Sequence, residues 1–155
     1  MKNLIVAVPS IKEPIQPSPG FWKKHLSDDK LDLMALCAFG CSYCSSNMGN
    51  YLRINRELFA DITEAALGER LYPTDKPELT LIWPDVLDKL DAQLKRRGPS
   101  WGVGKTLVVS MQTDPFSGPA LHEGTTEAAL RMVLERSAFR IRILTKNSIV
   151  GLSSV

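Results

Sequence analysis

The chain has 155 residues, of which 19 are Lys or Arg and 17 are Asp or Glu, so its formal net charge is +2. Apolar residues make up 44% and charged residues 23%, an ordinary globular composition that argues against wholesale disorder. No apolar run approaches the roughly 20 residues of a membrane helix. The short apolar run 4–8, which Pro9 ends, lacks the features of a secretory signal. The sequence therefore predicts an intracellular, cytoplasmic protein, made of one domain or part of a larger one.

The first 30 residues are predicted to form an irregular N-terminal segment, because prolines and a glycine recur through them. These residues are Pro9, Pro14, Pro17, Pro19 and Gly20. The apolar run Leu31–Leu36 then predicts a short buried strand that leads directly into a loop.

Residues 50–70 have helical spacing, because apolar side chains recur every three or four positions. The predicted apolar face consists of Tyr51, Ile54, Leu58, Ile62, Ala65 and Ala66. Residues 71–81, which include Pro73 and Pro77, are predicted to form a loop. A second helix is predicted to open at 83–85, with a proline in its first turn, and to end near Gly98. Its apolar face is Val86, Leu87, Leu90 and Leu94.

The segment 106–111 is β-branched and apolar, which predicts a buried parallel strand. A turn over 114–119 follows, then a helix from Thr125 or Thr126 to about Ser137, and a third strand over 140–145. Alternating strands and helices imply an α/β fold with a parallel sheet and right-handed crossovers. Three parallel strands do not close a barrel, which needs roughly 200 residues or more. We therefore expect the chain to be the N-terminal part of a larger protein.

The three cysteines, Cys37, Cys41 and Cys44, lie within eight positions of one another. An odd, clustered set in an intracellular chain is a poor disulfide framework, so metal or redox chemistry is the better interpretation. On a loop, the spacing C-x3-C-x2-C lets three thiolates converge on one iron–sulfur cluster and leaves one iron without a protein ligand. A structural zinc site needs a fourth ligand, and neither His25 nor His122 lies at ligand spacing from the cysteines.

The segment Cys37–Cys44, with Tyr43 directly before the last cysteine, resembles the radical S-adenosylmethionine (SAM) signature, C-x3-C-x-aromatic-C. Two further segments resemble the spore photoproduct lyase-like branch of that superfamily. They are Ser110–Phe116, which reads S-M-Q-T-D-P-F, and Leu144–Ser148, which reads L-T-K-N-S. Both lie where a predicted strand ends, and the resemblance covers about residues 31–150.

The resemblance implies a partial (β/α) radical SAM barrel, truncated after the third strand, with 31–155 as the N-terminal part of this core domain. It implies an enzyme with two cofactors, a [4Fe–4S] cluster and SAM. Reductive cleavage of SAM then gives methionine and a 5′-deoxyadenosyl radical, which abstracts hydrogen from a substrate. The implied partners are SAM and a reductant such as flavodoxin or ferredoxin. Nucleic acid is implied as a partner by family analogy only, since the balanced charge of the chain does not favour nucleic-acid binding.

The same resemblance assigns a role to each matching residue. Three thiolates ligate iron, an aromatic residue borders the adenine, and polar residues at strand ends hold the methionyl group. The iron ligands are Cys37, Cys41 and Cys44, and the SAM contacts are Tyr43 at the adenine, Thr113 and Asp114 near the methionyl amino group, and Lys146 at the methionyl carboxylate.

Plainer interpretations stay open for several of these residues. Asp114 precedes a proline and is a good turn former, Lys146 suits a solvated strand end, and Tyr43 suits simple packing against its loop. Ser45 departs from the family pattern, and so does the end of the chain after the third strand.

The tryptophans Trp22, Trp83 and Trp101 are predicted to be packing residues rather than a stacking platform. The alternative function is that of a truncated or degenerate, non-catalytic protein that binds an iron–sulfur cluster or zinc.

Overall fold

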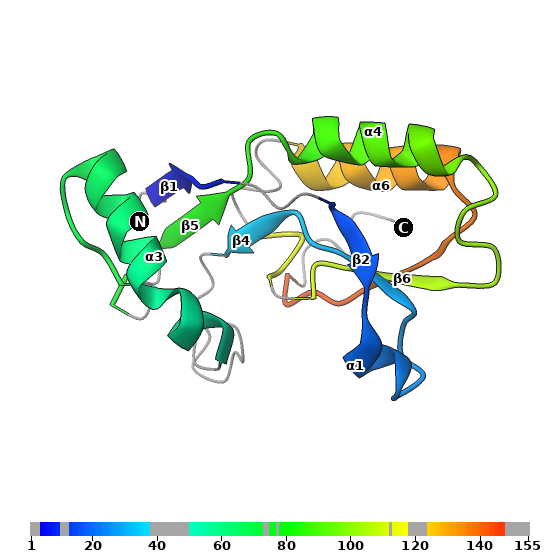
Figure 1. Cartoon of the computed structure of the whole chain (residues 1–155), viewed down its shortest axis with the longest axis horizontal. Coiled ribbons are helices and arrows are strands. Elements are labelled where there is room, and N and C mark those ends of the chain that lie inside the picture. The colour runs from blue at the N-terminus through cyan, green and yellow to red at the C-terminus, as the bar shows by residue number, and fades with distance from the viewer. Residues whose placement is uncertain are drawn as a thin grey trace.

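The structure, a computed structural model, describes residues 4–9, 13–37, 50–72, 75–76, 78–111, 113–117 and 124–147, with the backbone alone over 50–53. Over these ranges the chain is a mixed α/β protein with two small sheets (Figure 1). The strands are β1 (Leu4–Ala7), β2 (Ile15–Pro17), β3 (Asp29–Leu31), β4 (Met34–Leu36), β5 (Leu79–Ile82), β6 (Thr106–Val109) and β7 (Arg140–Ile143). The helices are α1 (Pro19–Trp22), α3 (Asn50–Leu67), α4 (Val86–Arg97) and α6 (Thr125–Arg136).

The larger sheet has the strand order β2-β3-β6-β7, in which β3, β6 and β7 run parallel and β2 is antiparallel. In this register Asp29 pairs with Leu107, and Thr106 pairs with Arg140. The smaller sheet has the order β1-β5-β4, with β1 parallel and β4 antiparallel to β5. The carboxyl ends of β3, β6 and β7 therefore meet at one edge of the larger sheet, and their amino ends meet at the opposite edge.

One apolar core joins the two sheets and the helices. Helices α4 and α6 lie side by side (Figure 1) and bury Leu90, Leu94, Ala129 and Val133 in the same core as β6. Burying one Leu or Val side chain contributes about 1.5–3 kcal/mol. This packing holds the larger sheet rigid, so the loops at both of its edges start from fixed points.

The elements predicted for the second half of the chain are present, although Pro84 lies before α4 rather than in its first turn, and β6 and β7 are each two residues shorter than predicted. Helix α4 follows Asp85 and ends at Gly98, whose φ of 81° glycine adopts without steric cost. Helix α6 lies within the predicted range, and β6 and β7 pair in parallel as expected. The signals that predict these elements are local, because caps and apolar periodicity depend only on neighbours in the sequence.

Several predictions for the first half are wrong, beginning with the irregular segment and the loop. The segment 1–30 contains β1, β2, α1 and the start of β3, and the loop predicted over 71–81 contains the start of β5. Pro17 is compatible with β2 because this strand lies at a sheet edge, where a residue without an N–H is tolerated. Strands β1 and β5 are only four residues long and pair with each other, so neither carries a periodic signal of its own.

The single strand predicted over Leu31–Leu36 is in fact two strands. Strand β3 pairs with β6, whereas β4 pairs with β5 in the other sheet. Asp32 lies between them, and its carboxylate accepts the N–H of Met111 at 3.0 Å and pairs with the ammonium of Lys30 at 3.1 Å. The sequence predicts a single strand here because both short strands carry buried, mostly apolar side chains.

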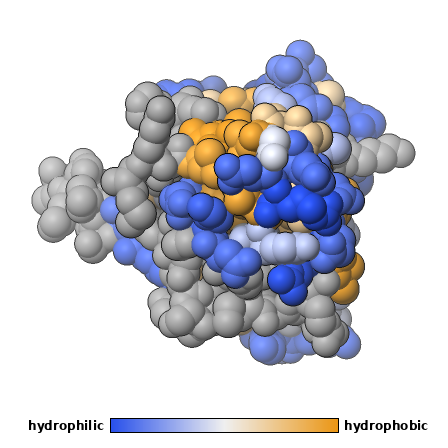
Figure 2. All heavy atoms as spheres, turned by 90° about the vertical axis from the view of Figure 1, so that its left-hand side faces the viewer, coloured by the Kyte–Doolittle hydropathy of each residue, from blue (hydrophilic) through white to orange (hydrophobic). Residues whose placement is uncertain are grey.

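Helix α3 is present, but the apolar face predicted for it is wrong in part, because Ile62 packs against the core whereas other members of that face are exposed. Ile54 is 77% exposed and Leu58 is 53% exposed, while Phe59, Ala60 and Thr63 are buried. The helix is turned so that Phe59 enters the core that also contains the β1 and β5 side chains. Figure 2, which faces this end of the molecule, shows an apolar patch among charged side chains.

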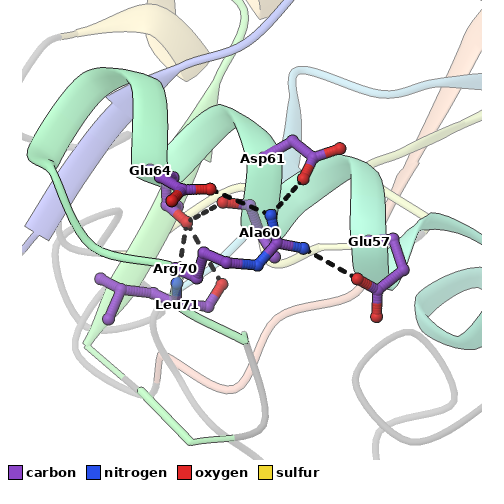
Figure 3. Close-up of polar contacts among 7 residues, drawn as sticks. Glu57, Ala60, Asp61, Glu64, Arg70 and Leu71 are labelled. Carbon is purple, nitrogen blue, oxygen red and sulfur yellow. Dashed lines mark hydrogen bonds and ion pairs between the residues drawn. The ribbon is translucent and has the colours of Figure 1, made fainter.

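Arg70 follows α3 and binds three acidic side chains that share one face of the helix (Figure 3). Its guanidinium contacts Glu57 at 2.8 Å, Glu64 at 3.0 Å, and Asp61. Next to it, the Thr63 hydroxyl accepts the N–H of Leu71 at 2.9 Å, which ties the chain after the helix back onto the helix. These ion pairs lie on the exposed, acidic face of α3.

Candidate functional site

Asp114 joins the turn after β6 to the turn after β7, at the carboxyl edge of the larger sheet. Its Oδ1 accepts the hydroxyl of Thr145 at 2.7 Å and the N–H of Phe116 at 2.9 Å. Its Oδ2 accepts the N–H of Lys146 at 2.6 Å. Two segments that resemble the same family are therefore bound to each other by one carboxylate, although they lie about 30 positions apart.

Local sequence explains why each turn forms. The contact from the Asp114 carboxylate to the N–H two residues later is the Asx turn that Asp-Pro sequences favour. In the second turn, the Thr145 hydroxyl accepts the N–H of Asn147 at 3.0 Å in the same way. The Asn147 side-chain amide then donates to the carbonyl of Phe116 at 2.9 Å, which adds a second link between the turns.

Thr113 and Lys146 lie in these turns, beside Asp114. Thr113 is buried, and its hydroxyl has no hydrogen-bond partner in the part of the chain that the structure describes. Lys146 is exposed, and its backbone N–H is held by Asp114. The structure thus brings together the three predicted SAM contacts that it describes.

Cys37 directly follows β4, and its residue is 7% exposed. It forms a buried pair with Met34, whose sulfur lies 3.7 Å from the hydroxyl of Ser117. Ser117 belongs to the Asp114 turn, so the first cysteine of the motif lies close to that turn. Cys41, Tyr43 and Cys44 fall outside the described residues, as does Ser148 at the end of the L-T-K-N-S segment.

The end of β6 has an unusual backbone. Ser110 has a φ of 57°, in the left-handed region that few non-glycine residues adopt. Its N–H donates to the carbonyl of Leu31 at 2.6 Å, and its hydroxyl is buried with no partner among the described residues. Sequence reasoning named Ser110 only as the first residue of a motif and missed this conformation, which no local signal predicts.

Sequence reasoning also missed the link that Asp114 makes. The signal that was available is the placement of polar residues directly after two neighbouring parallel strands, because such ends meet at one edge. Asp114 forms a turn, as its plainer interpretation expects, and in addition binds the β7 turn. Its predicted contact with the methionyl amino group stays a prediction.

Searches of protein-family models, curated proteins and solved structures find no match to this chain. Among the described residues, no group of three or more His, Cys, Asp or Glu side chains is arranged to hold a metal ion. No described helix is long and apolar enough to cross a membrane.

Proposed function

We propose that this chain is a radical SAM protein that binds a [4Fe–4S] cluster through Cys37, Cys41 and Cys44 and cleaves SAM reductively. One observation carries the proposal. Cys37, the first residue of the C-x3-C-x-aromatic-C motif, follows a buried strand and lies, through Met34, beside the turn that holds Asp114. The first residue of the cysteine motif thus lies close to one of the two turns whose sequences resemble the same family.

Two features of the described residues support the proposed cofactors. The Thr113 hydroxyl is buried without a partner in the described ranges, and such a group is expected where a ligand supplies the missing contact. The position of Cys37 in a buried pair with Met34 shields its thiol from water. When bound, a reduced cluster supplies the electron that breaks the carbon–sulfur bond of SAM, and a reductant such as flavodoxin or ferredoxin restores it.

The residues of this chain bind and orient the methionyl group in the proposal. Asp114 holds the backbone of Lys146, so the lysine side chain starts from a fixed point and its ammonium pairs with the methionyl carboxylate. A carboxylate has about four lone-pair sites. Asp114 uses three of them for Thr145, Phe116 and Lys146, which leaves capacity for one further donor, the methionyl amino group.

The test is anaerobic reconstitution with iron and sulfide, followed by electron paramagnetic resonance of the reduced protein with and without SAM. We expect a four-iron signal that changes when SAM is added. Separate Cys37→Ala, Cys41→Ala and Cys44→Ala variants lose the signal. The matched control is Ser46→Ala, which lies in the same segment outside the cysteine pattern and keeps the signal.

Three outcomes contradict the proposal. They are a full cluster in the Cys37→Ala variant, a cluster signal that SAM leaves unchanged, and a metal analysis that finds zinc instead of iron. The last result would favour the non-catalytic metal-binding alternative.

A further inference from the structure

The amino edge of the larger sheet holds a cavity, at the opposite end of the sheet from the Asp114 turn. Its volume is about 200 Å³, and its lining includes Trp22, His25, Ser27, Thr106 and Arg140. The register explains this gathering, because Thr106 and Arg140 are paired first residues of neighbouring parallel strands. In Figure 1 the short helix α1, which ends at Trp22, lies away from the α4 and α6 layer.

Trp22 is not the packing residue that the sequence predicts, because 61% of it is exposed. The prediction holds for Trp83, which is 6% exposed, and for Trp101, whose ring packs edge-on against Phe139 at 5.1 Å. Trp22 also lines an adjacent hollow of about 320 Å³, together with Pro17 and other residues. An exposed indole between two hollows offers a flat surface on which another ring can stack.

The cavity is lined by one cation, Arg140, and one carboxylate, Asp28. Arg140 and His25 line it, and the exposed Lys23 and Lys24 directly follow Trp22. The nearest carboxylates are engaged within the chain. Asp28, which also lines the cavity, accepts the N–H of Thr106 at 2.8 Å.

The other carboxylate at this edge is Asp29, which is buried and lies 3.7 Å from the ammonium of Lys105. Burial raises the pKa of Asp29, while Lys105 lowers it. Each carboxylate thus has one contact within the chain, Asp28 with a backbone N–H and Asp29 with an ammonium.

Two further features indicate a binding site rather than an incidental hollow. Ser27 lines the cavity, is 4% exposed, and its hydroxyl has no hydrogen-bond partner among the described residues. His25 has a φ of 54°, a conformation that costs free energy in a non-glycine residue. A ligand oxygen that bonds the Ser27 hydroxyl removes the cost of leaving it unpaired.

We propose that this cavity binds the phosphate group of a small aromatic phosphomonoester, whose ring stacks on Trp22. Arg140 supplies a charge-assisted hydrogen bond, which a phosphate favours, and a ring N–H of His25 supplies a further donor. Ser27 supplies a further donor, and the neighbouring hollow beside Pro17 accommodates the ring. The proposal is independent of the cluster at the opposite edge, and it holds whether or not the chain cleaves SAM.

The test is titration of the full chain with phenyl phosphate, inorganic phosphate and phenol, followed by calorimetry and by tryptophan fluorescence. We expect saturable binding of phenyl phosphate, weaker binding of inorganic phosphate and none of phenol. Arg140→Ala lowers the affinity about tenfold, the effect of one charge-assisted contact. The matched control is Arg131→Ala, an exposed arginine on α6 outside this cavity, which leaves the affinity unchanged.

Two variants separate binding from folding. Trp22→Ala lowers the affinity for phenyl phosphate and leaves that for inorganic phosphate unchanged. Ser27→Ala lowers the affinity for both anions without lowering the melting temperature of the free protein, because the hydroxyl has no partner there. The proposal is overturned if phenyl phosphate fails to bind, if Arg140→Ala binds it as well as the parent, or if both anions bind equally.

Discussion

The two edges of the larger sheet use the same device, an aspartate that accepts a backbone N–H from the neighbouring segment. At the amino edge, Asp28 accepts the N–H of Thr106 with one oxygen. At the carboxyl edge, Asp114 uses both oxygens and accepts donors from Thr145, Lys146 and Phe116. At the amino edge, the Asp28 carboxylate makes one hydrogen bond to the start of β6. At the carboxyl edge, the Asp114 carboxylate joins two turns, and we call this set of hydrogen bonds the Asp114 clasp.

The two edges also share two features that lower the stability of the folded chain. Each has one non-glycine residue in the left-handed region, His25 at the amino edge and Ser110 at the carboxyl edge. Each also has buried hydroxyls without partners in the described chain, including Ser27 at one edge and Thr113 at the other. Both ends therefore have hydroxyls without partners in the described chain, but their turns are joined differently. At the carboxyl end a carboxylate joins them, whereas at the amino end arginine side chains donate to the carbonyls of Leu26 and Gly104.

The largest expected effect is that of Asp114→Asn. Asparagine has one acceptor oxygen, so its NH₂ group must face at least one donor of the clasp, which costs about 1–3 kcal/mol of unfolding free energy. Asp28→Asn keeps an acceptor for the Thr106 N–H and costs less than about 1 kcal/mol. Urea unfolding of both variants measures the difference. Equal losses of unfolding free energy in the two variants would show that Asp114 and Asp28 contribute equally to stability, which contradicts the prediction.

The next effect concerns Ser110, the residue with a left-handed backbone at the carboxyl edge. Ser110→Gly relieves a left-handed conformation that costs about 1–2 kcal/mol, against about 0.5–1 kcal/mol of added chain entropy in the unfolded state. We therefore expect the stability to rise by up to about 1 kcal/mol. Ser110→Ala is the control, because it removes the hydroxyl and keeps the strain. If the melting temperature rises equally in both variants, the unfavourable free energy comes from the buried hydroxyl of Ser110 and not from its backbone conformation.

The unpartnered hydroxyls give a smaller effect. Thr113→Val and Ser27→Ala remove a buried hydroxyl that has no partner among the described residues, so they are expected to keep or raise the unfolding free energy, by up to about 1 kcal/mol. Thr63→Val is the positive control, because that hydroxyl accepts the Leu71 N–H, and its loss costs about 1–3 kcal/mol. Thermal unfolding compares the three variants. A large loss in Thr113→Val would mean that its hydroxyl is satisfied within the chain.

The smallest expected effect is a pH dependence at the amino edge. Burial raises the folded-state pKa of Asp29 above its ordinary value of 3.8. Ionisation of Asp29 therefore costs stability, and this cost is absent below pH 3.8 and grows as the pH rises through the folded-state pKa. Asp29→Asn removes that component, so its stability falls less between pH 4 and 7. Parallel pH profiles for the variant and the parent would contradict this sign.

The sequence by itself determined the second half of the fold. Helix α4 has an Asp at its start, a Gly at its end and apolar residues at helical spacing, and these signals need no distant partner. The buried character of β6 and the turn at Asp114 are likewise local, because Asp-Pro favours an Asx turn wherever it occurs. The cysteine pattern is also a property of the sequence alone.

Tertiary structure alone decided the first half and the contacts of the candidate sites. Strands β1 and β5 exist because they pair with each other across about 75 positions of sequence, and the exposed face of α3 follows from its packing against them. The clasp of Asp114 and the exposure of Trp22 depend on which strand ends the sheet brings together. Periodicity and propensity record only near neighbours, so they predict elements well but cannot predict which polar groups meet after folding.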